Sequence, residues 1–121
     1  MPKTEVVLYS EEDGTCPLLE WMDSIPPKAQ DKCIVRIERL SEMGHELRRP
    51  EADHLRDKIY ELRVALHRIQ YRILYFFNNK LGVISHGFIK EGDKVPPREI
   101  NLAIERKERF NRNPPKHTCR G

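Results

Sequence analysis

Residues 70–77 read QYRILYFF and form the most hydrophobic run of the chain. In an extended strand, successive side chains point to opposite faces. One face of this strand is wholly apolar and consists of Ile69, Tyr71, Ile73, Tyr75 and Phe77. The other face consists of Gln70, Arg72, Leu74 and Phe76. A permanently charged guanidinium inside such a run must meet water, a carboxylate or a ligand, so Arg72 is the first candidate for a functional residue.

Strands are expected on both sides of this one, which itself spans residues 68–78. Residues 58–64 (KIYELRV) alternate an apolar set, Tyr60/Leu62/Val64, with a mixed set, Ile59/Glu61/Arg63. Residues 81–90 (LGVISHGFIK) form the next strand after a turn at residues 78–80. Because the links between the three strands are short, the pattern predicts an antiparallel meander.

The rest of the chain predicts one short strand and three helices. The strand covers residues 4–9, and helices follow at residues 15–22, 28–43 and 98–110. Residues 45–57 are polar and basic and are expected to be irregular. The resulting order is β-α-α-β-β-β-α, an α+β fold with a small, mainly antiparallel sheet packed on two N-terminal helices and a C-terminal helix. Residues 1–110 are expected to form one domain and residues 111–121 a flexible tail.

Charge is unevenly distributed along the 121 residues. The formal net charge is +3, but residues 1–24 hold one base and six acids, and the remainder holds 21 bases and 13 acids. This asymmetry suggests a polyanionic partner for the later part of the chain. No apolar run approaches a membrane span and no secretory signal is visible, so a cytoplasmic location without a membrane partner is expected. The three cysteines are far apart, which is typical of reduced thiols.

The face that carries Arg72 gathers the candidate catalytic residues. If this face is open, it presents Glu61, Arg63, Arg72, His86 and Lys90. A basic rim for RNA binding would consist of Arg48, Arg49, His54, Arg56, Lys94 and Arg98. Guanidinium groups bind phosphates and stabilise the charge of a phosphorane. Cleavage of a phosphodiester by the neighbouring 2′-hydroxyl also needs a base, for which His86 and Glu61 are candidates, but it needs no metal.

Simpler interpretations stay open for the same residues. Arg72 could form a plain cross-strand ion pair with Glu61, and His86 could be a structural histidine. Gly87 could mark a bulge that moves His86 to the other face. A glycine-rich phosphate loop, an HExxH motif and a cluster of Cys/His ligands are all missing from the sequence, so neither a metal nor a cofactor is expected.

Three stretches together are similar to a known family. RRPEADHLRDKIYELRV (48–64), QYRILYFF (70–77) and ISHGFIKEGDKVPPREINLAIERKERF (84–110) resemble the phage-derived, HigB-like branch of the RelE/ParE toxin superfamily. The resemblance implies a toxin of a type II toxin–antitoxin module that cleaves mRNA in the ribosome, leaves a 2′,3′-cyclic phosphate and uses no metal or cofactor. It also implies a cognate antitoxin partner, a HigA-like helix-turn-helix protein.

The resemblance carries over to individual residues only in part. Arg72 occupies the place of the arginine in the family's YR motif, and Lys90 approximately matches the basic residue that closes the meander. Two lysines that RelE has just before the hairpin turn have no clear match here, and Ile59 and Glu61 lie in that region. The late tyrosine of RelE is also unmatched, with Arg98 nearest. The general base therefore stays open, as do a ParE-like inhibitor of DNA gyrase and a non-catalytic nucleic-acid-binding module.

Overall fold

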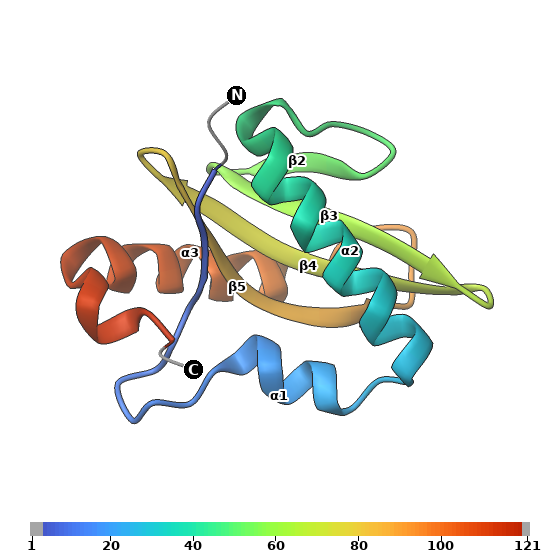
Figure 1. Cartoon of the computed structure of the whole chain (residues 1–121), viewed down its shortest axis with the longest axis horizontal. Helices are drawn as coiled ribbons and strands as arrows, with labels where there is room; N and C mark the ends of the chain where they lie inside the picture. The colour runs from blue at the N-terminus through green and yellow to red at the C-terminus, as the bar shows by residue number, and fades with distance from the viewer. Residues whose placement is uncertain (1–3, 120–121) are drawn as a thin grey trace.

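Across residues 4–119, which the computed structural model describes, five strands form one mixed sheet (Figure 1). The strands are β1 (Val6–Leu8), β2 (Ala52–Arg56), β3 (Ile59–Leu66), β4 (Ile69–Asn78) and β5 (Leu81–Lys90). Their order is β1-β5-β4-β3-β2. The meander β2 to β5 is antiparallel, and β1 pairs in parallel with β5. The α+β class and the predicted meander are therefore confirmed.

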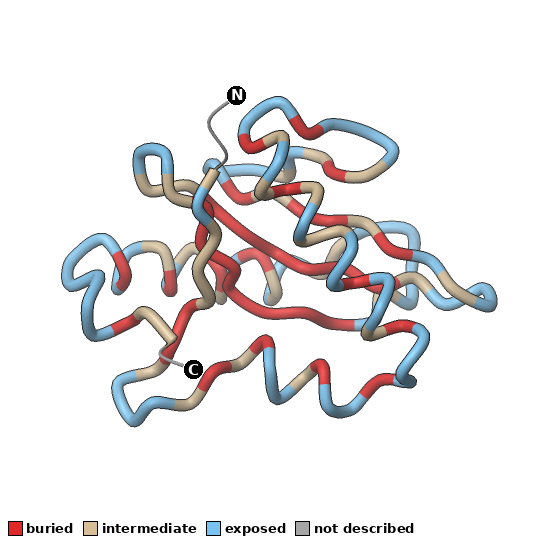
Figure 2. The backbone as a smooth tube through the Cα atoms, in the orientation of Figure 1, coloured by how far each residue is buried: buried red, intermediate tan, exposed pale blue. Residues whose placement is uncertain are grey.

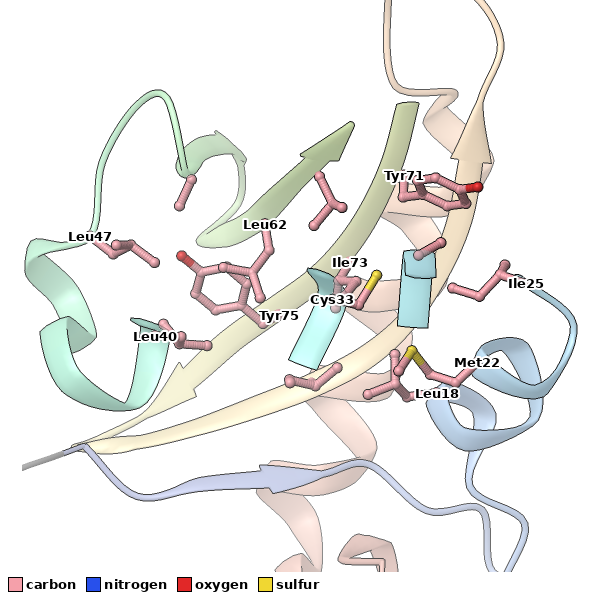
Figure 3. Packing of buried hydrophobic residues seen from close by; sticks show 14 residues of the cluster. Leu18, Met22, Ile25, Cys33, Leu40, Leu47, Leu62, Tyr71, Ile73 and Tyr75 are labelled. Carbon is pink, nitrogen blue, oxygen red and sulfur yellow. The ribbon is translucent and has the colours of Figure 1, made fainter. Parts of the chain in front are cut away.

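Helices α1 (Pro17–Asp23) and α2 (Pro27–Met43) cover one face of the sheet. Helix α2 starts with a proline in its first turn, where the missing N–H is not needed, and ends at Gly44 with a positive φ of 56°. The core on this face joins Leu18, Met22, Cys33 and Leu40 of the helices to Leu62, Tyr71, Ile73 and Tyr75 of the strands (Figure 3). The apolar face predicted for residues 69–77 is thus buried at Tyr71, Ile73 and Tyr75, whereas Ile69 at the start of β4 is exposed.

Helix α3 (Pro97–Arg112) covers part of the opposite face, which the sequence analysis expected to be open. Figure 1 shows α2 in front of the sheet and α3 behind it. Ala103 and Phe110 of α3 pack with Leu74, Phe76 and Val83 of the sheet in a second core. The physical reason is that Leu74 and Phe76 lie on the same face as Arg72, and leaving them in water would be unfavourable. Figure 2 shows the result, with β4 and β5 buried along most of their length.

Strand β2 is a second difference from the sequence-based prediction. It lies within residues 45–57, which were expected to be irregular, and pairs with the first half of β3 at the edge of the sheet. The short stretch ADHLR has no apolar run, and it is held by backbone pairing with β3 together with the burial of Ala52. A two-residue turn, Asp57–Lys58, connects β2 to β3 with φ values of 53° and 64°. The β3–β4 turn, His67–Arg68, also has positive φ values, 52° and 68°.

Strand β5 contains a bulge at Ser85, because Leu74 pairs with His86 while the next residue, Tyr75, pairs with Ile84. His86 consequently lies on the α3 face of the sheet. Gly87 is not the site of the bulge. It faces α1, where the ring of Trp21 contacts its Cα so closely that a Cβ would not fit.

The C-terminal segment packs against β1 as far as the structure describes it. After α3, residues Pro114–His117 form a short 3₁₀ turn, η2, and the buried ring of His117 stacks on Tyr9 with centroids 5.1 Å apart. Thr118 forms a β-bridge with Tyr9. Residues 111–119, for which the sequence predicted a flexible tail, instead lie against the domain, because α3 continues to Arg112 and the buried Tyr9 provides a surface for His117.

Candidate functional site

A cleft of about 340 Å³ opens on the α3 side of the sheet, beyond the part that α3 covers. Its floor is formed by neighbouring residues of β3, β4 and β5, and its sides by β2, the loop before α3 and the first turns of α3. We call it the basic cleft. It is lined by Arg49, Asp53, Leu55, Arg56, Glu61, Arg63, Arg72, Lys90, Asp93, Lys94, Val95 and Ile100.

A buried ion pair lies at the floor of the basic cleft. Nε of Arg72 is 3.0 Å from Oε1 of Glu61, and the two side chains are only 2% and 8% exposed. The ion pair that the sequence left open as an alternative is therefore present. The two atoms are close, but neither has a hydrogen-bond partner of good geometry among the described residues. Arg72 is further held by Nη1, which donates to the carbonyl of Tyr71 and to Oε1 of Gln70.

Burial controls the protonation of this pair. Burial raises the pKa of Glu61, although Arg72 and Arg63 oppose the shift. Burial also lowers the pKa of Arg72, but a guanidinium starts so high that it stays charged. Arg63 is half-exposed, and its Nε lies 4.0 Å from Oε2 of Glu61. The floor therefore holds one carboxylate with an affinity for protons above the ordinary value and two fixed positive charges.

The walls of the basic cleft add more positive than negative charge. Together the lining residues comprise six bases and three acids, a formal excess of +3. Arg49 is paired with Asp53 at 2.7 Å, and Arg56 donates to Asn101 and to Asp57. Lys90 and Lys94 form no ion pair within residues 4–119. An anion that enters the cleft therefore meets at least two cations that need not break an existing pair.

His86 does not line the basic cleft. Its Nε2 lies 2.9 Å from Oε1 of Glu99 on α3, and its Nδ1 lies 2.8 Å from the hydroxyl of Ser85. The histidine is buried beneath α3, and this burial lowers its pKa. The structure thus gives His86 two polar partners inside the fold and separates it from Arg72, with which the sequence analysis had grouped it.

Three residues of the predicted basic rim also lie elsewhere. Arg48 donates to the backbone carbonyls of His45 and Leu47. His54 is on the α2 face, where its ring meets that of Tyr60 edge-on with centroids 5.1 Å apart. Arg98 is 81% exposed at the start of α3. The basic cleft therefore brings together Glu61, Arg63, Arg72, Lys90, Arg49, Arg56 and Lys94, but not these three residues or His86.

Five lining residues were not predicted as site residues from the sequence: Asp53, Leu55, Asp93, Val95 and Ile100. Asp53 and Leu55 face the cleft because they alternate with Ala52 and His54 along β2, and that alternation was the available signal. Asp93 and Val95 belong to the loop before α3, whose course follows from tertiary packing. Ile100 was assigned to the apolar stripe of α3, but its nearness to Arg72 depends on how α3 docks.

The arrangement is suited to binding a phosphate group and accepting a proton beside it. Arginine and lysine supply charge-assisted hydrogen bonds to phosphate oxygens, and a carboxylate can accept a proton as a general base. Within the described part of the chain, no group of three or more His, Cys, Asp or Glu residues could hold a metal ion. None of the helices in residues 4–119 is long and apolar enough to cross a membrane.

A family model matches most of the chain. The model of a family described as "Phage derived protein Gp49-like (DUF891)" matches residues 20–108, which include α2, the whole β2–β5 meander and most of α3. Every residue that lines the basic cleft lies within the matched range. A search of the curated proteins finds no match to the chain.

Proposed function

The chain belongs to the phage-derived Gp49-like family, a family of RelE/HigB-like toxins in toxin–antitoxin systems, and from this premise we propose that it is a ribosome-dependent mRNA endoribonuclease. The family is associated with RelE-type toxins that are endoribonucleases. The single observation that supports this activity most is the buried Glu61–Arg72 pair at the floor of a cleft with an excess of positive charge.

In the proposed reaction, the scissile phosphate of an mRNA binds between the cations of the floor. Arg72, Arg63 and Lys90 contact its oxygens and stabilise the extra negative charge of the phosphorane. Glu61 accepts the proton of the 2′-hydroxyl, whose oxygen then attacks the phosphorus. The bond to the 5′-oxygen of the next nucleotide breaks, and a protonated group or water supplies the proton for this leaving oxygen. The products are a 2′,3′-cyclic phosphate and a free 5′-hydroxyl.

Glu61 is a better candidate for the base than His86 on structural grounds. Glu61 lines the cleft, and its raised pKa brings it closer to the pH at which a general base is most efficient. His86 would need α3 to move before it could contact a substrate, because Glu99 occupies its Nε2. We therefore assign His86 a structural role. We assign Arg49, Arg56 and Lys94, which line the cleft, to contacts with the phosphates that flank the scissile one.

A toxin of this family has an antitoxin partner. We propose that this partner is a helix-turn-helix protein of the HigA type and that the toxin acts in the cytoplasm, where its ribosomal target is. An antitoxin that covers the basic cleft would block the site directly, and one that binds the helices would act from a distance.

The proposal is tested by a translation reaction with a defined mRNA, in which RNA ends are mapped by primer extension with and without ribosomes. The informative variants are Arg63→Ala, whose side chain is partly exposed, and the double variant Arg72→Met with Glu61→Gln, which removes both buried charges together. Arg112→Ala, at the exposed end of α3, is the matched control.

We expect cuts only with ribosomes, a loss of rate of about a hundredfold for Arg63→Ala and at least as much for the double variant. Arg112→Ala should cut like the wild type. Full cleavage by the double variant would overturn the assignment of the site. Blocked translation with intact mRNA would mean that the protein inhibits the ribosome without cleaving RNA. Gyrase trapped on DNA would mean that the protein inhibits gyrase.

A further inference from the structure

The two walls of the basic cleft differ in chemistry. The floor described above, with Glu61, Arg63, Arg72 and Lys90 on β3, β4 and β5, is here called the charged wall. The sides of the cleft also carry charged residues, but Leu55, Val95 and Ile100 on β2, the loop before α3 and α3 form an apolar part of them, here called the apolar wall. These three side chains belong to the margin of the second core, and Leu55 and Val95 are partly exposed there. Binding of a phosphate explains only the charged wall.

An apolar wall beside a phosphate site is complementary to a nucleobase. The faces of a base are apolar and planar, and burying them against aliphatic side chains removes apolar surface from water. The cleft volume of about 340 Å³ lies within the range of small-ligand sites, about 300–1,000 Å³. One nucleotide unit can therefore place its phosphate against one wall and its base against the other.

Asp93 gives this base position a polar contact. Its carboxylate lines the cleft, is exposed and has no ion pair within residues 4–119, unlike Asp53, which is bound to Arg49. A carboxylate repels phosphate, so its presence in a phosphate-binding cleft needs another explanation. An ionised carboxylate only accepts hydrogen bonds. The exocyclic amino group of a base is a suitable donor, as in the contact that Asp and Glu make with cytosine N4.

We propose that Leu55, Val95 and Asp93 form a nucleobase subsite that prefers a base with an exocyclic amino group. The inference rests on the proposed RNA site, because the phosphate of the same nucleotide binds the charged wall. In cleavage, the subsite would select the base next to the scissile phosphate. Asp93 is then a specificity-determining residue and takes no part in the chemistry.

The test measures binding of mononucleotides, which needs neither ribosomes nor cleavage. Dissociation constants are determined by calorimetry for ribose 5-phosphate, adenosine 5′-monophosphate and purine riboside 5′-monophosphate. The last two differ only in the amino group. The proteins are the wild type, Asp93→Ala, Val95→Ser and the control Asp23→Ala, an exposed acid at the end of α1. The readout is the ratio of the dissociation constants of the two purine nucleotides. Removing any acid strengthens binding of all three anions, and this general effect cancels in the ratio.

For the wild type we expect adenosine monophosphate to bind about fivefold more tightly than purine riboside monophosphate, and both to bind more tightly than ribose 5-phosphate. Asp93→Ala should reduce the ratio of the two dissociation constants to about one, and Asp23→Ala should leave it at the wild-type value. Val95→Ser should weaken both nucleotides about fivefold and leave ribose 5-phosphate unchanged.

Three results would overturn the proposal. Equal binding of ribose 5-phosphate and both nucleotides would remove the base subsite and leave the phosphate site of the proposed function intact. An unchanged ratio in Asp93→Ala would remove Asp93 from the subsite. If none of the three anions binds, the result counts against both the subsite and the RNA site. Whether the protein cleaves mRNA is decided separately, by the ribosome-dependent cleavage assay.

Discussion

Replacing Arg72 with methionine should lower the free energy of unfolding, because it leaves the carboxylate of Glu61 buried and unpaired. Methionine keeps most of the side-chain volume and removes the charge, so the change isolates the ion pair with Glu61. Both partners are almost fully buried, at 2% and 8% exposure, and Arg72 is the largest influence that opposes the raised pKa of Glu61. From the sequence alone, Arg72 is expected on an open face of the sheet. In the structure its removal is expected to affect folding as well as activity.

The size of the effect follows from the protonation of Glu61. Without Arg72, the folded protein avoids an unpaired buried charge by binding a proton at Glu61. At pH 7, protonating a carboxyl with an ordinary pKa of about 4.3 costs roughly 3.7 kcal/mol, at 1.36 kcal/mol per pH unit. This agrees with the 3–5 kcal/mol typical of breaking a buried pair. At pH 5 the same step costs only about 1 kcal/mol. The folded variant holds the extra proton, so its deficit grows as pH rises.

The assay is urea unfolding of wild type and variant at pH 7 and pH 5. The deficit of Arg72→Met should fall from about 3–4 kcal/mol to about 1 kcal/mol between the two conditions. Titration of His86 affects both proteins equally and cancels in the difference. The double variant Arg72→Met with Glu61→Gln should stay near the wild type at both pH values. If the loss of unfolding free energy in Arg72→Met is the same at both pH values, or if there is none at pH 7, the buried charge pair is refuted.

Three smaller changes test other parts of the packing. Because burial lowers the pKa of His86, stability should fall as pH drops below about 6.5, and His86→Gln should flatten that fall in urea unfolding at pH 7.5 and 5.5. Gly87→Ala pushes a methyl group into the indole of α1 and should cost about 1–3 kcal/mol, whereas Gly92→Ala, in open space, should leave Tm unchanged. Replacing the β3–β4 turn by His67→Asn with Arg68→Gly should add about 1 kcal/mol, because both native residues have positive φ.

Each of these outcomes has a clear contrary result. An unchanged pH profile in His86→Gln would mean that the histidine is not buried in its neutral form. Equal losses for the two glycine variants would remove the close contact with α1 as the cause. A turn variant with a lower midpoint of thermal unfolding than the wild type would show that the native turn residues form stabilising contacts.

The sequence predicted the meander correctly because its signals are local. The alternation of Tyr60, Leu62 and Val64 and the apolar run around Ile73 each indicate a strand, and short links restrict how these strands pair. The grouping of Glu61, Arg63 and Arg72 followed directly, since alternation alone places all three on one face. The structure confirms that face in the basic cleft.

What the sequence did not predict depends on contacts between distant segments. Strand β2 has too few apolar residues to be recognised, so its contribution of Leu55 to the cleft was missed. The sheet face that carries Arg72 was expected to be open. In the structure α3 docks on Leu74 and Phe76 and covers part of that face, and the cleft lies on the uncovered part. The bulge at Ser85 keeps His86 on the Arg72 side, but α3 then encloses it. Local patterns thus identified the charged floor, and tertiary packing determined its walls.

The parallel pairing of β1 with β5 has a consequence for the order in which the chain can fold. Val6–Leu8 pair with Gly82–Ile84, and the backbone N–H of Ser10 and the carbonyl of Leu8 bond to His117 and Cys119. The first strand to be synthesised therefore waits for partners from the last third of the chain. Contacts of such long sequence separation form late and slow the folding step. During translation, β1 must therefore stay unpaired until β5 has emerged from the ribosome.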